Sequence, residues 1–145
     1  MIWSGHKKLW SILPVILSVS VILVVVLPPY DFSLQALRDK GGVELLFPGI
    51  GESSLADGLR NVLLFFPLGF FCTLLGVSRR WSFFAIAIWI GLTSLILSYW
   101  IELIQIFLPG RFPSIIDVFS NTVGGLVGFS VFYLLYREAT QRISR

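Results

Sequence analysis

The sequence predicts an all-α membrane protein of a single domain, residues 1–145, in which four transmembrane helices form a compact bundle with both termini in the cytoplasm. Hydrophobic residues make up 56% of the 145 residues, charged residues make up 13%, and the mean hydropathy is +0.87. A soluble domain of this length could not hide so much apolar surface from water. Four apolar segments follow one another along the chain, and each is close to the length that crosses the hydrocarbon core of a bilayer.

The first apolar segment, residues 9–27, follows a basic N-terminus, so a secretory signal peptide has to be considered. The segment ends in Pro28-Pro29-Tyr30 and no cleavage pattern of small residues follows it. We therefore interpret it as an uncleaved transmembrane helix. Pro14 lies early in the segment, where a kink or a late start costs a helix least.

A long loop, residues 28–58, separates the first segment from the second. Asp31 or Ser33 is suited to cap a short helix that reaches Lys40. Loops of this length are often functional.

The second segment, residues 60–77, contains Pro67, which a transmembrane helix tolerates when its neighbours satisfy the freed backbone group. The third segment, residues 81–108, is longer than a span needs, so we expect it to tilt or to project from the bilayer. The fourth segment covers residues 115–136.

The basic residues of the loops predict the orientation, because cytoplasmic loops carry an excess of lysine and arginine. Seven basic residues fall on one side of a four-span arrangement: Lys7, Lys8, Arg79, Arg80, Arg137, Arg142 and Arg145. Four fall on the other side: Arg38, Lys40, Arg60 and Arg111. The difference favours cytoplasmic termini and an outer 28–58 loop.

Small and polar residues share one face of each of the last three segments, if each residue turns a helix by about 100°. In the third segment they are Gly91, Ser94, Ser98, Glu102 and Gln105, and in the fourth Asp117, Asn121, Gly124 and Gly128. In the second segment they are Asn61, Gly69, Cys72 and Gly76. The spacing of Gly124 and Gly128 lets helices approach closely. We therefore assign Pro67, Gly69, Gly124 and Gly128 to helix packing.

The polar residues of these faces fall in one layer near the outer interface, and an arginine in the intervening turn closes over them. The predicted set is Asn61, Glu102, Gln105, Arg111, Asp117 and Asn121, with Arg60 beside them. Three interpretations stay open: a ligand or substrate site, a structural clasp of paired charges and amides, or solvated polar residues with no role. Charged groups at the edge of a bilayer are usually paired and often functional.

At these residues the sequence resembles the VanZ-like family of small bacterial membrane proteins. The matching residues are Asn61, Phe65, Pro67, Gly69, Phe70, Glu102, Gln105, Arg111, Asp117, Asn121, Gly124 and Gly128. The family takes its name from an accessory protein of glycopeptide resistance that lowers susceptibility to teicoplanin. The resemblance implies a protein of the bacterial plasma membrane that is linked to the cell envelope. It does not imply that this chain confers resistance.

A binding or accessory protein is the first functional hypothesis. Its outward-facing pocket would hold the head group of an envelope lipid or lipid-linked saccharide, with Arg111 on a phosphate or carboxylate. The alternative is an enzyme that acts on a lipid-linked substrate. In that case Glu102 and Asp117 would serve as acid and base, or would hold a divalent cation with Asn121.

Other classes of function are disfavoured by the sequence. With one cysteine and one histidine, the chain cannot form an internal disulfide or a zinc site of several Cys or His ligands. The net charge of +3 reflects membrane topology, so we expect no nucleic acid partner. We expect neither a metal nor another cofactor. Four spans without an inverted repeat make a poor transporter, although a homo-oligomer could supply the missing half.

Overall fold

The computed structural model describes residues 3–40 and 54–143, and for residues 3–10 it describes the backbone alone. Every regular element in these ranges is an α-helix, which confirms the all-α class. The helices are α1 (Trp3–Val26), α2 (Leu34–Asp39), α3 (Leu55–Ser78), α4 (Phe83–Gln105) and α5 (Ile115–Ile143). Residues 41–53 of the predicted outer loop lie outside the described residues.

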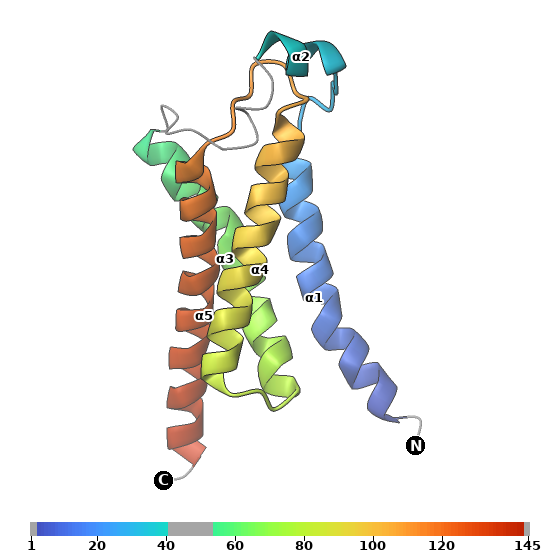
Figure 1. Ribbon diagram of the computed structural model, residues 1–145. Helices are drawn as coiled ribbons and strands as arrows, with labels where there is room; N and C mark the ends of the chain where they lie inside the picture. Colours follow the sequence, from blue (N-terminus) through green and yellow to red (C-terminus); the bar gives the residue numbers. More distant parts are fainter. Residues whose placement is uncertain (1–2, 41–53, 144–145) are drawn as a thin grey trace.

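The four long helices lie side by side, and the short α2 crosses one end of the bundle (Figure 1). We call this end the α2 end; it holds the last turns of α1 and α4 and the first turns of α3 and α5. At the opposite end, which we call the terminal end, lie the start of α1 and the end of α5 (Figure 1). The hairpin between α3 and α4 also turns at the terminal end.

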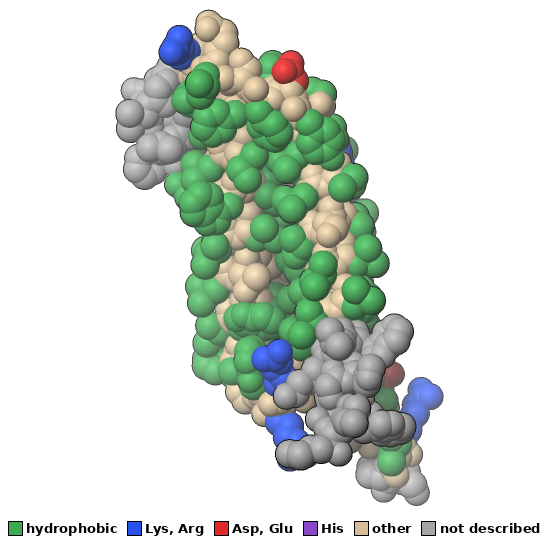
Figure 2. Space-filling model, turned by 90° about the vertical axis from the view of Figure 1, so that its right-hand side faces the viewer, with side chains coloured by type: hydrophobic (Ala, Val, Ile, Leu, Met, Phe, Trp, Pro, Cys, Tyr) green, Lys and Arg blue, Asp and Glu red, His purple; other side chains and the backbone are tan. Residues whose placement is uncertain are grey.

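Three of the helices, α3, α4 and α5, are long and apolar enough to cross a membrane. The part of α1 whose side chains are described, Ser11–Val26, is a shorter apolar helix. In the face that Figure 2 presents, hydrophobic side chains cover the middle of the molecule and charged side chains lie near its two ends. This distribution is that of a protein embedded in a bilayer.

Local capping explains where several helices begin. α3 starts five residues before the predicted span, because Ser54 and Asp57 form a capping box in which each side chain bonds the other residue's backbone N–H. Ser33, and not Asp31, caps α2 by accepting a 3.1 Å hydrogen bond from the N–H of Gln35.

The last two helices end away from the predicted limits of their spans. α4 ends at Gln105, three residues before the predicted limit, because the next backbone bonds run from Phe107 to Ile104 and from Leu108 to Gln105 and form tight turns. α5 continues to Ile143, seven residues beyond its predicted span.

Close contact between α3 and α5 sets the geometry of the bundle. A Cβ added to Gly124 would stand 2.9 Å from Val62 Cα, and one added to Gly128 would stand 2.8 Å from the backbone nitrogen of Phe70. On α3, a Cβ at Gly69 would overlap the backbone of Gly125. Only glycine allows the two backbones to approach this closely. The contact fixes the first turns of α3 and α5 beside each other at the α2 end.

Candidate functional site

A polar cavity of about 470 Å³ opens at the α2 end, between α1, α3, α4 and α5. All six residues of the predicted set line it: Asn61, Glu102, Gln105, Arg111, Asp117 and Asn121. Arg60, Asp57 and Ser114 are also among the lining residues. The structure therefore brings together, around one space, polar residues that come from three helices and a turn.

Glu102 lies on the floor of the cavity and is only 2% exposed. One oxygen of its carboxylate, Oε2, accepts a 2.9 Å hydrogen bond from the backbone N–H of Ser114. Ser114 directly precedes α5, and its carbonyl accepts the bond from Val118 that opens the helix. Glu102 thus satisfies an N–H at the start of α5. The dipole of α5 also stabilises a carboxylate at this position.

Asn121 is the second buried polar residue of the floor, with 4% of its surface exposed. Its Nδ2 donates a 2.8 Å hydrogen bond to Ser98 Oγ on α4. Among the described residues, three buried side-chain oxygens have no hydrogen-bond partner: Asn121 Oδ1, Ser114 Oγ and Ser94 Oγ. A buried polar atom without a partner costs about 1–3 kcal/mol. Asn121 and Ser114 are among the residues that line the polar cavity, whereas Ser94 is not.

Gln105 has a structural role of the kind that the clasp interpretation expects of an amide. Its Nε2 donates a 3.2 Å hydrogen bond to the carbonyl of Val26, the last residue of α1. The last carbonyls of a helix have no partner within it, so Gln105 joins the end of α1 to α4. This contact supports the clasp interpretation for Gln105, while the side chain still lines the cavity.

Charged side chains surround the mouth of the cavity. Arg60, Arg111 and Asp57 are exposed there, and Asp117 is half-buried. Asp57 Oδ2 accepts hydrogen bonds from Ser54 Oγ at 2.6 Å and from Ser54 N at 3.2 Å. The guanidinium groups are thus displayed to solvent, whereas the amide and hydroxyl acceptors lie deeper.

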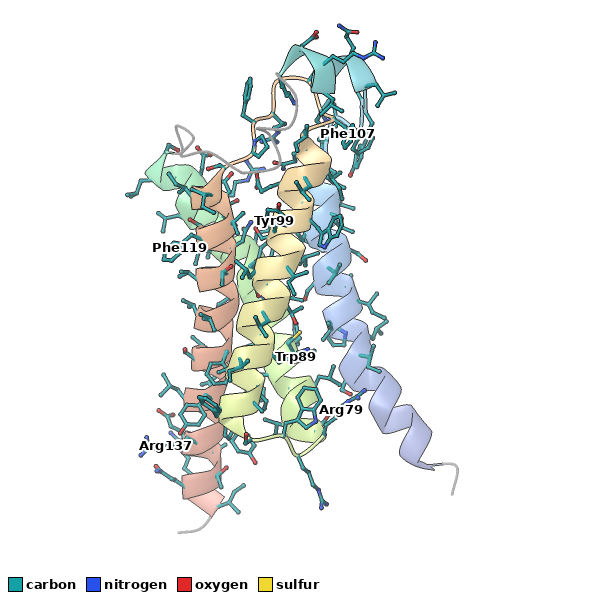
Figure 3. All side chains as sticks on the ribbon, in the orientation of Figure 1. Arg79, Trp89, Tyr99, Phe107, Phe119 and Arg137 are labelled. Carbon is teal, nitrogen blue, oxygen red and sulfur yellow. The ribbon has the colours of Figure 1, made fainter. Side chains whose placement is uncertain are left out.

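The turn that carries Arg111 is fixed to the end of α2 by Lys40. Lys40 Nζ donates to the carbonyls of Ile106, at 2.8 Å, and of Leu108, both of which follow the end of α4. It also lies 5.6 Å from the centre of the Phe112 ring. Burial lowers the pKa of the Lys40 ammonium from its usual 10.5, whereas the carbonyl partners favour its charged form. Figure 3 shows Phe107 in this turn, above the end of α4.

Sequence reasoning missed three residues that shape the site. Asp57 had a signal, because Ser54-x-x-Asp57 has the spacing of a capping box. Ser114 also had one, because a serine directly before an apolar helix is a typical N-cap residue. Lys40 lies 65 residues before Gln105, the nearest of its partners along the chain, and no local pattern predicts that contact.

Among the side chains that the structure describes, in residues 11–40 and 54–143, no three or more of His, Cys, Asp or Glu are grouped so that they could hold a metal ion. The carboxylates of Glu102 and Asp117 line the same cavity. Their position permits proton transfer or hydrogen bonding to a bound molecule.

Comparison with known proteins gives one match. The model of the family described as VanZ/LLP1 matches residues 11–136. No curated protein and no solved structure matches the chain. The matched range includes every described residue that lines the polar cavity.

Proposed function

Because the chain belongs to the VanZ/LLP1 family, we propose that it is an envelope-associated protein of the bacterial plasma membrane whose polar cavity binds the head group of a lipid or lipid-linked saccharide. The observation that carries this proposal is that two residues lining the cavity, Asn121 and Ser114, each have a buried side-chain oxygen without a partner among the described residues. Hydroxyl or amine groups of a head group are suitable donors for them.

The mouth of the cavity has the chemistry that an anionic group requires. Arg60 and Arg111 are exposed on the lining, and a guanidinium group binds phosphate or carboxylate through paired hydrogen bonds. Asp57 and Asp117 lie beside them, so a head group that also carries hydroxyl or ammonium groups fits better than a bare anion. A glycosylated or zwitterionic head group meets both requirements.

The topology that this function needs has four spans, with the α2 end on the outer side and both termini in the cytoplasm. The exposed arginines Arg79, Arg80, Arg137 and Arg142 support it, because they belong to the terminal end; Arg79 and Arg137 are labelled there in Figure 3. Single cysteines placed at Arg38 and Arg137 in a Cys72→Ala background test it in intact cells. A membrane-impermeant thiol reagent should label the first and not the second, and the reverse pattern would refute this orientation.

Lipid co-purification tests the binding proposal. Native mass spectrometry of the protein released from bacterial membranes should reveal one class of retained lipid in the wild type. Arg111→Ala should lose that lipid, because Arg111 lines the mouth. Arg137→Ala, which removes an exposed arginine at the terminal end, is the control and should retain it. Equal retention by the wild type and both variants would remove the basis for the proposal.

An enzyme acting on a lipid-linked substrate is the second candidate function. It is favoured by the two carboxylates of the cavity, one of them buried and hydrogen-bonded and the other half-buried, since unlike surroundings suit an acid and a base. Purified protein would then convert a labelled envelope lipid, and both Glu102→Gln and Asp117→Asn would abolish the conversion. The absence of turnover across a broad panel of envelope lipids would count against catalysis and leave binding intact.

A further inference from the structure

A shallow apolar hollow of about 520 Å³, widely open to the outside, lies beside the polar cavity on the neighbouring face of α3. The described residues that line it are Ala56, Leu59, Arg60, Leu63 and Leu64. Arg60 and Leu64 also line the polar cavity. The two spaces are therefore adjacent, and Arg60 stands at their boundary.

The register of α3 explains this arrangement. At about 100° per residue, Leu59 and Leu63 lie roughly 160° around the helix from Asp57 and Asn61, and Arg60 falls between the two pairs. The first pair faces the hollow and the second faces the cavity. The remaining face packs on α5, where Val62 meets Gly124.

The surroundings of the hollow are suited to a hydrocarbon chain. Leu59 and Leu63 are 57% and 71% exposed, although α3 is one of the helices apolar enough to cross a membrane. When such a helix lies in a bilayer, leucine side chains exposed on it are positioned to contact lipid chains. A molecule with a polar head in the cavity and a chain in the hollow would bring its linking group to Arg60.

We propose that the ligand is a lipid with a phosphate in its head group, that its hydrocarbon chain lies along Leu59 and Leu63, and that its phosphate pairs with Arg60. The inference rests on the proposed binding function and adds the class of ligand and the path of its chain. In such lipids the phosphate joins the polar group to the hydrocarbon part. Its place in the molecule therefore matches the place of Arg60 between the cavity and the hollow.

Binding of lipid phosphates to two variants separates this inference from the proposal on which it rests. Phosphatidylethanolamine, whose head group is zwitterionic, and phosphatidylglycerol, whose head group carries hydroxyl groups, are presented to the full-length protein in detergent micelles, and their dissociation constants are measured. Arg111→Ala alters the cavity. Leu63→Trp places a bulkier indole ring at the hollow and leaves the cavity residues unchanged. Leu92→Trp, at a leucine of α4 that is 53% exposed, is the matched control.

Leu63→Trp should weaken binding of one or both lipids about tenfold, the effect of excluding two or so methylene groups from an apolar contact. Leu92→Trp should bind as the wild type does. If Arg111→Ala weakens binding and Leu63→Trp does not, the hollow has no role and the cavity proposal stands. If Arg111→Ala has no effect on binding, both proposals fail. If the wild type binds neither lipid, this inference fails and lipid co-purification decides the cavity proposal.

A photochemical experiment on the wild-type chain avoids dependence on the folding of Leu63→Trp. Phosphatidylglycerol with a diazirine in its chain is cross-linked to the protein, and the adducts are mapped by peptide mass spectrometry. Adducts should concentrate at residues 59–64, and excess unlabelled phosphatidylglycerol should reduce them there more than at Leu92. An even distribution over exposed leucines would show an ordinary lipid annulus and overturn the inference.

Discussion

The carboxylate of Glu102 accepts a 2.9 Å hydrogen bond from the backbone N–H of Ser114, twelve residues further along the chain. This bond joins the last turns of α4 to the first residues of α5. It also holds one wall of the polar cavity, since both residues line it. The same carboxyl group therefore belongs to the frame of the bundle and to the site.

Because the hydrogen bond from Ser114 to Glu102 joins α4 to α5, two substitutions of Glu102 should have different effects on stability. Glu102→Ala leaves the buried N–H of Ser114 without its acceptor and should lower the free energy of unfolding by about 1–3 kcal/mol. Glu102→Gln keeps an acceptor oxygen in place and should change the free energy by less than about 1 kcal/mol. SDS-induced unfolding in mixed micelles measures both. Equal losses would mean that the hydrogen bond contributes nothing.

The two partners Asn121 and Ser98 should also differ on substitution. Ser98→Ala leaves Asn121 Nδ2 buried and unpaired, which should cost about 1–3 kcal/mol. Asn121→Ala removes the same bond together with the unpartnered Oδ1, so the ligand-free protein should lose less stability. Lipid retention should nevertheless fall in Asn121→Ala. A larger stability loss in Asn121→Ala than in Ser98→Ala would contradict this account.

The packing of α3 on α5 predicts that glycine substitutions depend on position. Gly128→Ala forces a Cβ to within 2.8 Å of the Phe70 nitrogen, and such overpacking should cost about 1–3 kcal/mol. Gly91→Ala is the control, because its Cβ would stand 3.8 Å from the nearest atom, Leu126 Cδ2. Thermal unfolding in detergent should show a lower midpoint for the first variant and no decrease for the second. A decrease of the same size in both variants would exclude close packing as the cause.

Lys40 should stabilise the turn that carries Arg111. Lys40→Ala deprives the carbonyls of Ile106 and Leu108 of their donor and should lower the free energy of unfolding by about 1–2 kcal/mol. Arg38→Ala, at an exposed residue of α2, should have an effect within about 0.5 kcal/mol. Proteolysis between α4 and α5 should become faster only in Lys40→Ala. An unchanged cleavage rate would show that Lys40 does not fix the turn.

Helical periodicity alone predicted which polar residues would meet. Ser94, Ser98, Glu102 and Gln105 recur on one face of the third segment, and all four are buried in the structure. The match has a simple physical cause. A polar side chain in an apolar helix is stable only where a partner or a polar cavity receives it, so the polar face and the packed face coincide.

The partners of those residues could not be predicted in the same way. The bond from Gln105 to Val26 spans 79 positions and depends on where α1 ends relative to α4. The contact from Lys40 depends on how the chain passes over the end of α4. The predicted limits of two helices were wrong for a different reason. The second segment was placed by its apolar run alone, which begins after the capping box at Ser54. α5 continues through polar residues after its apolar run ends.

The structure of the protein bound to a lipid tests the central claim most directly. Crystals grown in a lipid mesophase that contains bacterial envelope lipids should show a head group in the polar cavity. We expect one of its donors within hydrogen-bond distance of Asn121 Oδ1 or Ser114 Oγ, and its anionic group beside Arg60 or Arg111. A cavity that holds only water molecules bonded to these atoms, with lipid confined to the outer surface, would contradict the account.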